Sequence, residues 1–359
     1  HSLRRRQRQM CIRDRLKKLR KRIYARIDAD GIVLVSGKGK RKTPIQRLSE
    51  WIDQCLAKLK QYTKDIHICG NRNSFSKTDH DATFMHMKED YMRNGQLKPG
   101  YNVNVATCSD FIIGSYISSD RNDVHTLIPF MEQLRKNYAG RNIGSVVVDS
   151  GYESEENYCW FEAHPETELY VKPSNHEAVK HRKYRTDISR RENMAYDAQT
   201  DTYTCANGKL LQRTQEKKTH TASGLEIATS VYECNECDGC PLKEKCIRAC
   251  GSKKPLEERY KVIYVSKRFA RQRQAMEAKI SSSKGCLLRV NRSIQAEGNF
   301  AYVKQDLDFR RFLLRGNMKV AAEWLLFSLA LNILHLHHKI QNRRLGSDLK
   351  IPSSFPAGL

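Results

Sequence analysis

The spacing of apolar residues in the middle of the chain predicts a strand, strand, helix, strand order. Residues 100–107 alternate strictly between apolar and polar positions, and a second aliphatic strand is expected over 110–117. Apolar residues then recur at helical spacing over 126–138. The β-branched run Val146–Val148 is the third strand. This order predicts an α/β fold that contains an antiparallel strand pair.

An acidic residue stands at the carboxyl end of the third strand. Asp149 follows the valines directly, and the Ser150-Gly151 break and a Glu-rich helix come after it. Because α/β folds place their chemistry outside the carboxyl ends of strands, Asp149 is the first catalytic candidate.

Helical spacing also predicts packing helices near both ends of the chain. Residues 44–62 have an amphipathic pattern, and a helical pattern returns from Ala270. The most apolar stretch, 320–336, is interrupted by Glu323 and Asn332. It is therefore expected to be a buried core helix and not a membrane span.

These patterns divide the chain into six parts. The first fifteen residues have no hydrophobic period and resemble a translated sequencing adapter, so a basic leader, non-native or disordered, is expected at the start. The parts are the leader 1–22, a helical segment 23–68, the first part of the α/β core 69–175, an inserted β-rich cysteine module 176–269, the second part of the core 270–345 and a tail 346–359.

The expected β-rich module ends in a cluster of cysteines. Cys234, Cys237, Cys240 and Cys246 have the spacing of a soft-metal site, and structural Zn²⁺ is one interpretation. Cys205 or Cys250 could replace one of the four. The alternatives are reduced thiols without a ligand and a redox role. No secretory signal precedes the twelve cysteines, so an intracellular protein with reduced thiols or metal ligands is expected.

The net charge changes the range of functions to consider. A formal charge of +24 predicts a polyanionic partner, and nucleic acid is the expected one. A basic surface that serves only solubility is the alternative. Arg310 and Arg311 are candidate phosphate contacts within this charge.

A second acidic candidate lies in the helical pattern from Arg292 to Lys304. Glu297 and Lys304 are seven residues apart, about two helical turns, so they are expected on one face. A carboxylate with a cation nearby suits metal ligation beside a phosphate contact, and an ordinary solvated helix face is the alternative. Gly298 in a helix interior predicts the close approach of another backbone.

Several segments together resemble the DDE transposases of bacterial insertion sequences, in the branch with a cysteine-bearing insertion between the second and third acids. The resemblance covers about 69–336 and implies an RNase H-like core, a mixed sheet with flanking helices. Asp149 matches the second acid and Glu297 the third. The segments are Lys98–Val103, Asn122–Leu127, Val148–Tyr158 and Ile294–Gly316.

The resemblance also implies a chemistry and its partners. Two Mg²⁺ or Mn²⁺ ions held by carboxylates would serve DNA cleavage and strand transfer at terminal inverted repeats and target DNA. Asp149 and Glu297 would be metal ligands, and Lys304, with Arg292, would contact phosphates. A homodimer in a synaptic complex and a cytoplasmic, nucleoid-associated protein without a membrane partner are expected.

The first acid of the family has no match in the chain. Its strand would fall before His1, so an amino-truncated fragment is expected. The substitutes are the pairs Asp28 with Asp30 and Asp79 with Asp81, which otherwise read as turn and cap residues. The alternative functions are an inactive remnant that only binds DNA and a generic RNase H-like nuclease.

Overall fold

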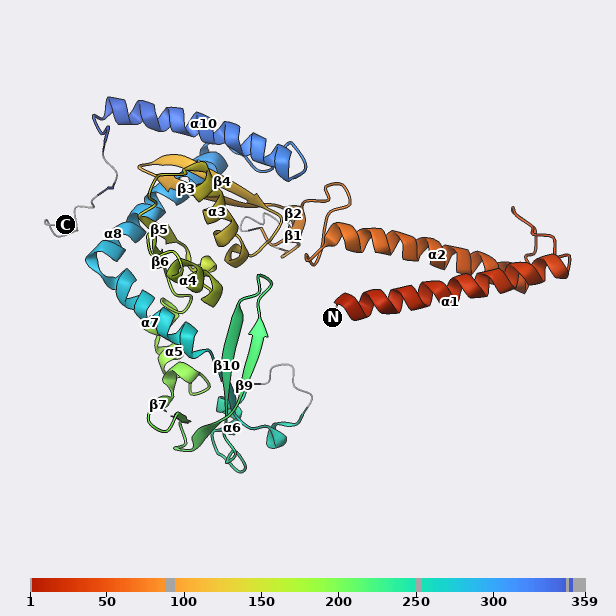
Figure 1. The fold of residues 1–359 in the computed structure, drawn as a ribbon, viewed down its shortest axis with the longest axis horizontal. Coiled ribbons are helices and arrows are strands. Elements are labelled where there is room, and N and C mark those ends of the chain that lie inside the picture. The colour runs from red at the N-terminus through yellow and green to blue at the C-terminus, as the bar shows by residue number, and fades with distance from the viewer. Residues whose placement is uncertain (1, 88–93, 249–253, 347–348, 351–359) are drawn as a thin grey trace. The chain divides into compact units, whose positions relative to one another are not determined.

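The chain forms two compact units in the computed structural model. They comprise residues 1–100 and 101–359 (Figure 1). The structure describes residues 2–87, 94–248, 254–346 and 349–350. Most of the predicted tail, and Cys250, therefore lie outside the described residues.

The first unit is built on two long helices that pack side by side (Figure 1). Ile23 and Ile27 of the first helix are buried against Ile52 of the second, as the amphipathic pattern predicts. Thr43 caps the second helix by accepting a hydrogen bond from the Gln46 N–H. The elements are α1 (Ser2–Ala29), α2 (Pro44–Cys69) and the antiparallel pair β1 (Thr83–Met85) and β2 (Lys98–Gly100).

Helix α1 occupies the segment for which a basic leader was predicted. It runs from Ser2 to Ala29, across the expected boundary at residue 22, so the disorder expected there is replaced by helix. The segment is rich in residues with a high helix propensity, namely Arg, Lys, Leu and Gln. A search for a hydrophobic period does not detect this propensity. The two buried isoleucines near its carboxyl end attach it to α2.

The second unit begins with the predicted order of strand, strand, helix and strand. The antiparallel pair lies within one or two residues of its expected bounds, and the helix is confirmed. These elements are β3 (Asn102–Cys108), β4 (Phe111–Ser118), α3 (Leu127–Asn137) and β5 (Ser145–Val148).

Strand β5 pairs in parallel with β6 (Glu168–Val171), and three helices cover the pair (Figure 1). The core between them is apolar and contains Met131 of α3, Phe161 and Ile280. The covering helices are α3, α4 (Glu155–Glu162) and α7 (Lys267–Ser281). In the described residues β3–β4 and β5–β6 are separate two-stranded sheets, which differs from the single mixed sheet that was expected. Strand β5 is consequently half-buried, not fully buried.

A five-stranded antiparallel sheet occupies the region of the predicted β-rich module. Its strand order is β11-β10-β9-β8-β7, and β9 and β10 extend beyond the others as a long hairpin (Figure 1). Its strands are β7 (Ala195–Asp197), β8 (Thr202–Thr204), β9 (Leu210–His220), β10 (Glu226–Glu233) and β11 (Val262–Val265).

The residues around Glu297 form one continuous helix that contains two π-helical segments. Helix α8 (Ser283–Arg292) continues into a π-helix over Ser293–Glu297, then α9 (Gly298–Ala301), then a second π-helix over Tyr302–Asp306. The predicted helix is confirmed, but its residues do not follow the 3.6 period.

Helix α10 (Asn317–Gln341) packs only one of its faces. Trp324 and Leu331 are buried with Val303, while Leu326 and Ile333 are exposed, so the expected full burial was wrong. The polar residues within it have partners, because the Asn332 amide bonds the backbone of β4. By length and composition α10 could cross a membrane, a test that core helices of soluble proteins also pass.

Candidate active site

The carboxylate of Asp149 lies exposed at the end of β5. Its backbone is extended, and its Oδ1 accepts hydrogen bonds from the Ser150 N–H at 2.6 Å and the Ser150 hydroxyl at 3.3 Å. These bonds begin the 3-10 turn Ser150–Tyr152, which ends the strand. The Val-Asp-Ser-Gly sequence therefore presents a solvent-accessible acid at a strand end.

A second carboxylate, which the sequence analysis did not nominate, faces this turn. A Cβ on Gly151 would lie 2.9 Å from Asp123 Oδ2, so a larger residue here would require the carboxylate to shift. The Asn102 amide donates to Asp123 Oδ1 at 2.6 Å. The signal for Asp123 was its place in the segment Asn122–Leu127, but only the fold brings it to Gly151.

A buried polar network fixes the position of the Asp149 turn. Asn104 in β3 is 2% exposed, and its Oδ1 accepts hydrogen bonds from the hydroxyls of Tyr152 at 2.5 Å and Thr126 at 2.8 Å. Burial raises the pKa of Tyr152 above its ordinary range, and the charges of Asp123 and Asp149 raise it further. The phenol therefore stays protonated and keeps donating to Asn104.

Glu297 ends the first π-helix with an exposed side chain. Arg292 Nη2 donates to Oε1 at 2.7 Å, and the Ser293 hydroxyl donates to Oε2 at 3.0 Å. No described atom lies within 4 Å of a Cβ added to Gly298, so the expected close approach of another backbone was wrong. Gly298 directly follows the π-helical turn that begins after Arg292.

The turn after Asp149 and the π-helix that carries Glu297 both contact β3, the turn through the bond from the Tyr152 hydroxyl to Asn104. The π-helix that carries Glu297 packs against β3, and α8 packs against β5, whose end carries Asp149. The Arg292 charge also counteracts, at Tyr152, the influence of Asp149 on the pKa of that phenol.

The predicted phosphate contacts lie on and after the second π-helix. The Lys304 ammonium is exposed and lies 5.9 Å from the Phe300 ring centroid. Arg310 pairs with Asp308 at 2.6 Å, and Arg311 is exposed in the same loop. Because π turns hold more residues than α turns, a spacing of seven residues does not by itself place Glu297 and Lys304 on one face of this helix.

The substitutes for the first acid lie in the first unit. Asp28 is in the last turn of α1, and Asp30 pairs with Arg26. Asp79 and Asp81 lie in a turn in which Asp79 Oδ1 accepts from the Asp81 N–H at 3.4 Å. These positions agree with the alternative interpretation, in which the four aspartates are ordinary turn and helix-end residues.

Five cysteines of the second unit belong to the five-stranded sheet and its connecting segments, and Cys234, Cys237 and Cys205 pack in the apolar core of the sheet. Cys234, Cys237 and Cys246 are buried, Cys205 and Cys240 are half-buried, and all five are free thiols. Burial, with contributions from the neighbouring Cys237 and Cys205, raises the pKa of Cys234 to about 11. Within the described residues, no three His, Cys, Asp or Glu side chains are arranged to hold a metal ion, so the structure does not support the zinc prediction as it stands.

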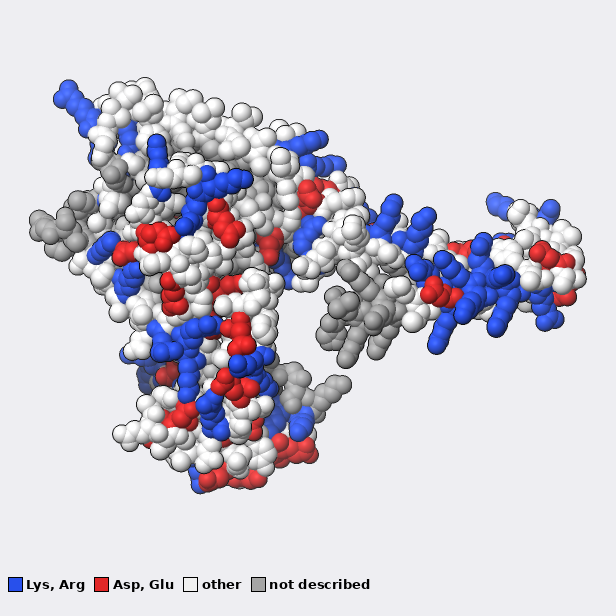
Figure 2. All heavy atoms as spheres, in the orientation of Figure 1, with Lys and Arg blue, Asp and Glu red and all other residues white. Residues whose placement is uncertain are grey.

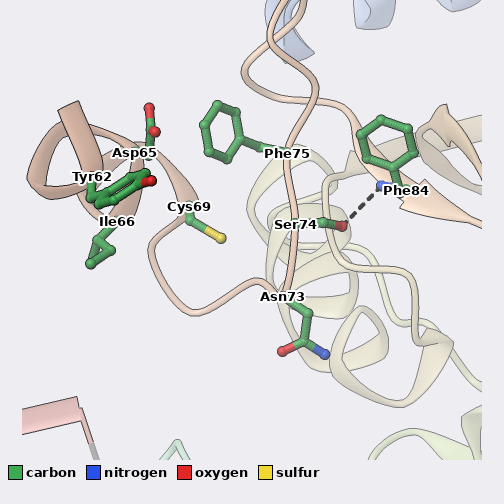
Figure 3. A pocket seen from close by; sticks show the side chains of 8 residues that line it. All are labelled: Tyr62, Asp65, Ile66, Cys69, Asn73, Ser74, Phe75 and Phe84. Atoms are coloured by element: carbon green, nitrogen blue, oxygen red, sulfur yellow. Dashed lines mark hydrogen bonds between the residues drawn. The ribbon is translucent and has the colours of Figure 1, made fainter. Parts of the chain in front are cut away.

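An open pocket of the first unit contains none of the predicted site residues. It lies between the end of α2 and the segment before β1 (Figure 3). Aromatic side chains dominate its wall, and its one carboxylate, Asp65, accepts a hydrogen bond from Gln61. The lining residues are Tyr62, Asp65, Ile66, Cys69, Asn73, Ser74, Phe75 and Phe84.

Basic side chains are abundant on both units. Figure 2 shows Lys and Arg gathered along α1 and α2, and mixed with Asp and Glu over the second unit. Such a surface suits a polyanion.

Comparison with known families gives one match. Residues 204–337 match the model of a family described as "Transposase DDE domain". No curated protein and no solved structure matches the chain. The match supports a DDE transposase family for this region, and enzymes of that family are in general DNA nucleases and strand transferases that use divalent metal ions. The matched region contains Glu297 and Lys304, whereas Asp149 lies before it.

Proposed function

We propose that this chain acts as a DDE transposase, cutting DNA at the ends of an insertion sequence and joining the cut strands to target DNA. The observation that carries the proposal is the convergence of two acid-bearing elements in a chain that matches the domain. Asp149 is exposed at the end of β5, the turn after it bonds Asn104 of β3 through Tyr152, and the π-helix that carries Glu297 packs against the same strand.

The two carboxylates have the right chemistry for Mg²⁺ or Mn²⁺. Both are exposed oxygen donors, and hard oxygen ligands are what these ions take. Asp149 and Glu297 would hold the ions, which supply charge stabilisation for phosphoryl transfer when bound. Glu297 now accepts from Arg292 and Ser293, so it must exchange these partners to become a ligand.

The remaining residues of the site position DNA and the acids. Asn104 and Tyr152 hold the turn that carries Asp149, and Gly151 leaves room for the Asp123 carboxylate. Lys304, Arg310 and Arg311 are exposed cations that suit contacts with backbone phosphates, and Arg292 can join them when it leaves Glu297.

Partners and location follow from the same resemblance. The DNA substrates are the terminal inverted repeats and a target site, and the active form is a homodimer in a synaptic complex. A bacterial cytoplasmic location in association with the nucleoid suits an enzyme of this kind, and the net charge of +24 supports contact with DNA.

A nicking assay with the full chain tests the proposal. Supercoiled plasmid should be nicked in the presence of Mg²⁺ or Mn²⁺ and not with a chelator. Asp149→Asn and Glu297→Gln should each reduce the rate at least about 100-fold, because each removes a charged ligand from the centre that stabilises the transition state. Glu132→Gln on the exposed side of α3 is the matched control and should nick normally. Nicking that survives Asp149→Asn contradicts the assignment.

A second function, DNA binding without catalysis, is favoured by one observation. In the part of the chain that the structure describes, no three acidic or other ligating side chains form a metal-holding group. Under this alternative the unaltered chain binds DNA, as judged by fluorescence anisotropy, but shows no metal-dependent nicking. The same pair of measurements therefore separates the two functions.

A further inference from the structure

We propose that two copies of this chain pair through helix α2, each helix packing against the other in antiparallel orientation. The contact surface is an apolar stripe of α2 beside the face that α1 covers. This surface specifies how the homodimer of the proposed function is held together, and it rests on that part of the proposed function. All residues of the contact belong to the first unit.

Helix α2 carries a row of apolar side chains along its whole length. Successive members of this stripe are 3, 4, 4, 3 and 4 residues apart, which is the 3.6-residue period of an α-helix. Four of the six members have exposed fractions between 38% and 57%. A contiguous exposed apolar surface of this kind is typical of a protein–protein interface. The exposed members are Leu48, Trp51, Tyr62 and Ile66, and the half-buried ones between them are Cys55 and Leu59.

Helix α1 covers a neighbouring face of α2. Ile23 and Ile27 of α1 are buried with Ile52, and Ile45 and Leu56 of α2 pack against the same cluster. Each residue turns a helix by about 100°, so the α2 members of this cluster point roughly a quarter turn away from the middle of the stripe. Helix α2 is therefore apolar on two faces, and α1 covers one of them.

The stripe is complementary to a second copy of itself in the antiparallel direction. With the two-fold axis at the middle of the stripe, Leu48 lies opposite Ile66 of the second copy, and Trp51 lies opposite its Tyr62. Because such a contact is isologous, each pairing occurs twice. Two aromatic pairs then flank the axis, and large aromatic side chains are the usual anchors of an interface.

The polar edge of the stripe favours the antiparallel orientation over the parallel one. Arg47, Gln54, Lys58 and Asp65 share the edge that lies away from α1. In the antiparallel pair Arg47 lies opposite Asp65 of the second copy, and Lys58 lies opposite its Gln54. A parallel pair would place each charge opposite its own equivalent, which is repulsive.

An open pocket at one end of the stripe provides room for side chains of the second copy. Its volume is about 470 Å³, and Tyr62 and Ile66 of the stripe line it together with Phe75 (Figure 3). The antiparallel pair directs Leu48 and Trp51 of the second copy to this end of α2. The apolar wall of the pocket suits both side chains.

The oligomeric state of the full chain tests this surface. The unaltered protein should sediment as a dimer at micromolar concentration in analytical ultracentrifugation. Trp51→Glu and Tyr62→Glu should each weaken the dimer at least about 30-fold, because each removes an aromatic anchor. Ala57→Glu is the matched control, since Ala57 is exposed on the side of α2 opposite the stripe, and it should leave the dimer intact.

A charge exchange tests the orientation. Asp65→Arg should weaken the dimer about tenfold, because it places two arginines opposite each other. Addition of Arg47→Asp to this variant should restore the affinity, a recovery that a folding defect would not show. A double variant no tighter than Asp65→Arg alone overturns the antiparallel pairing.

The outcomes separate this surface from the rest of the proposed function. A monomeric unaltered chain overturns both this surface and the homodimer. A dimer that survives Trp51→Glu and Tyr62→Glu overturns this surface alone. Metal-dependent nicking by the unaltered chain tests the catalytic assignment separately, whichever of these results is found.

Discussion

At the scale of single residues, the carboxylate of Glu153 shows how a charge is held inside this fold. Its side chain is 1% exposed and accepts two bonds from Arg273, both at 2.8 Å, one from the Tyr158 hydroxyl and one from the Ser174 N–H. Burial raises the pKa of Glu153, but the bonds from Arg273 and Ser174 outweigh it and lower the pKa below its ordinary value. This pair joins the segment before α4 to α7.

The lowered pKa of Glu153 predicts a pH-dependent loss of stability. The ionised carboxylate stabilises the fold fully above its unfolded pKa of about 4.3, and this contribution is lost as pH falls through the lower folded pKa. Glu153→Gln should therefore lower the free energy of unfolding by about 3 kcal/mol at pH 7. The gap to the unaltered chain should narrow below about pH 4.

Urea denaturation at neutral and acidic pH measures this gap. Glu132→Gln, at an exposed position of α3, is the control and should change stability little at either pH. A Glu153→Gln effect of the same size at both pH values would contradict the role of the charge.

At the scale of elements, two helical glycines differ in the space around them: Gly285 is closely packed against another backbone, and Gly298 is not. A Cβ on Gly285, near the start of α8, would lie 2.3 Å from the Lys279 carbonyl oxygen and 2.8 Å from Ile280 Cα, so glycine permits the tight α7–α8 corner. Gly298, beside Glu297, has no described atom within 4 Å of such a Cβ. The sequence drew attention to Gly298, whereas the packing depends on Gly285.

Alanine substitutions at these glycines should differ in sign. Gly285→Ala should destabilise the chain by about 1–3 kcal/mol, because the corner has to open around the methyl group. Gly298→Ala should be neutral or stabilise by up to about 1 kcal/mol, because alanine favours helix. Thermal unfolding followed by circular dichroism compares the pair. Equal destabilisation of both variants would show that the corner is not the constraint.

At the scale of the whole molecule, the charge of +24 predicts salt-sensitive binding to DNA. Each neutralised phosphate releases condensed counterions, so affinity should fall at least about tenfold between roughly 50 and 200 mM salt. Fluorescence anisotropy with labelled duplex DNA measures the slope of log affinity against log salt. Changing both Arg310 and Arg311 to Gln should reduce that slope by about two. A slope near zero in the unaltered chain would exclude a phosphate-dominated interface.

Much of the local structure was predictable because it depends on short-range patterns. The alternation over 100–107, the helical spacing over 126–138 and the valines before Asp149 each specify an element, and all three are present. The sequence prediction missed helix α1 because this helix depends on the helix propensity of its residues and not on a hydrophobic period.

The sequence by itself determined the element types, the basic charge and two acids for the proposed site, because period, composition and turn residues act within a few positions of the chain. Only the tertiary structure decided that the Glu297 helix packs against β3, whose Asn104 also accepts a bond from the turn after Asp149. It also decided that Asp123 faces Gly151 and that the Asn207 amide, in the turn after Cys205, donates to Cys240 Sγ. Contacts between distant segments depend on how whole elements pack, which no local pattern records.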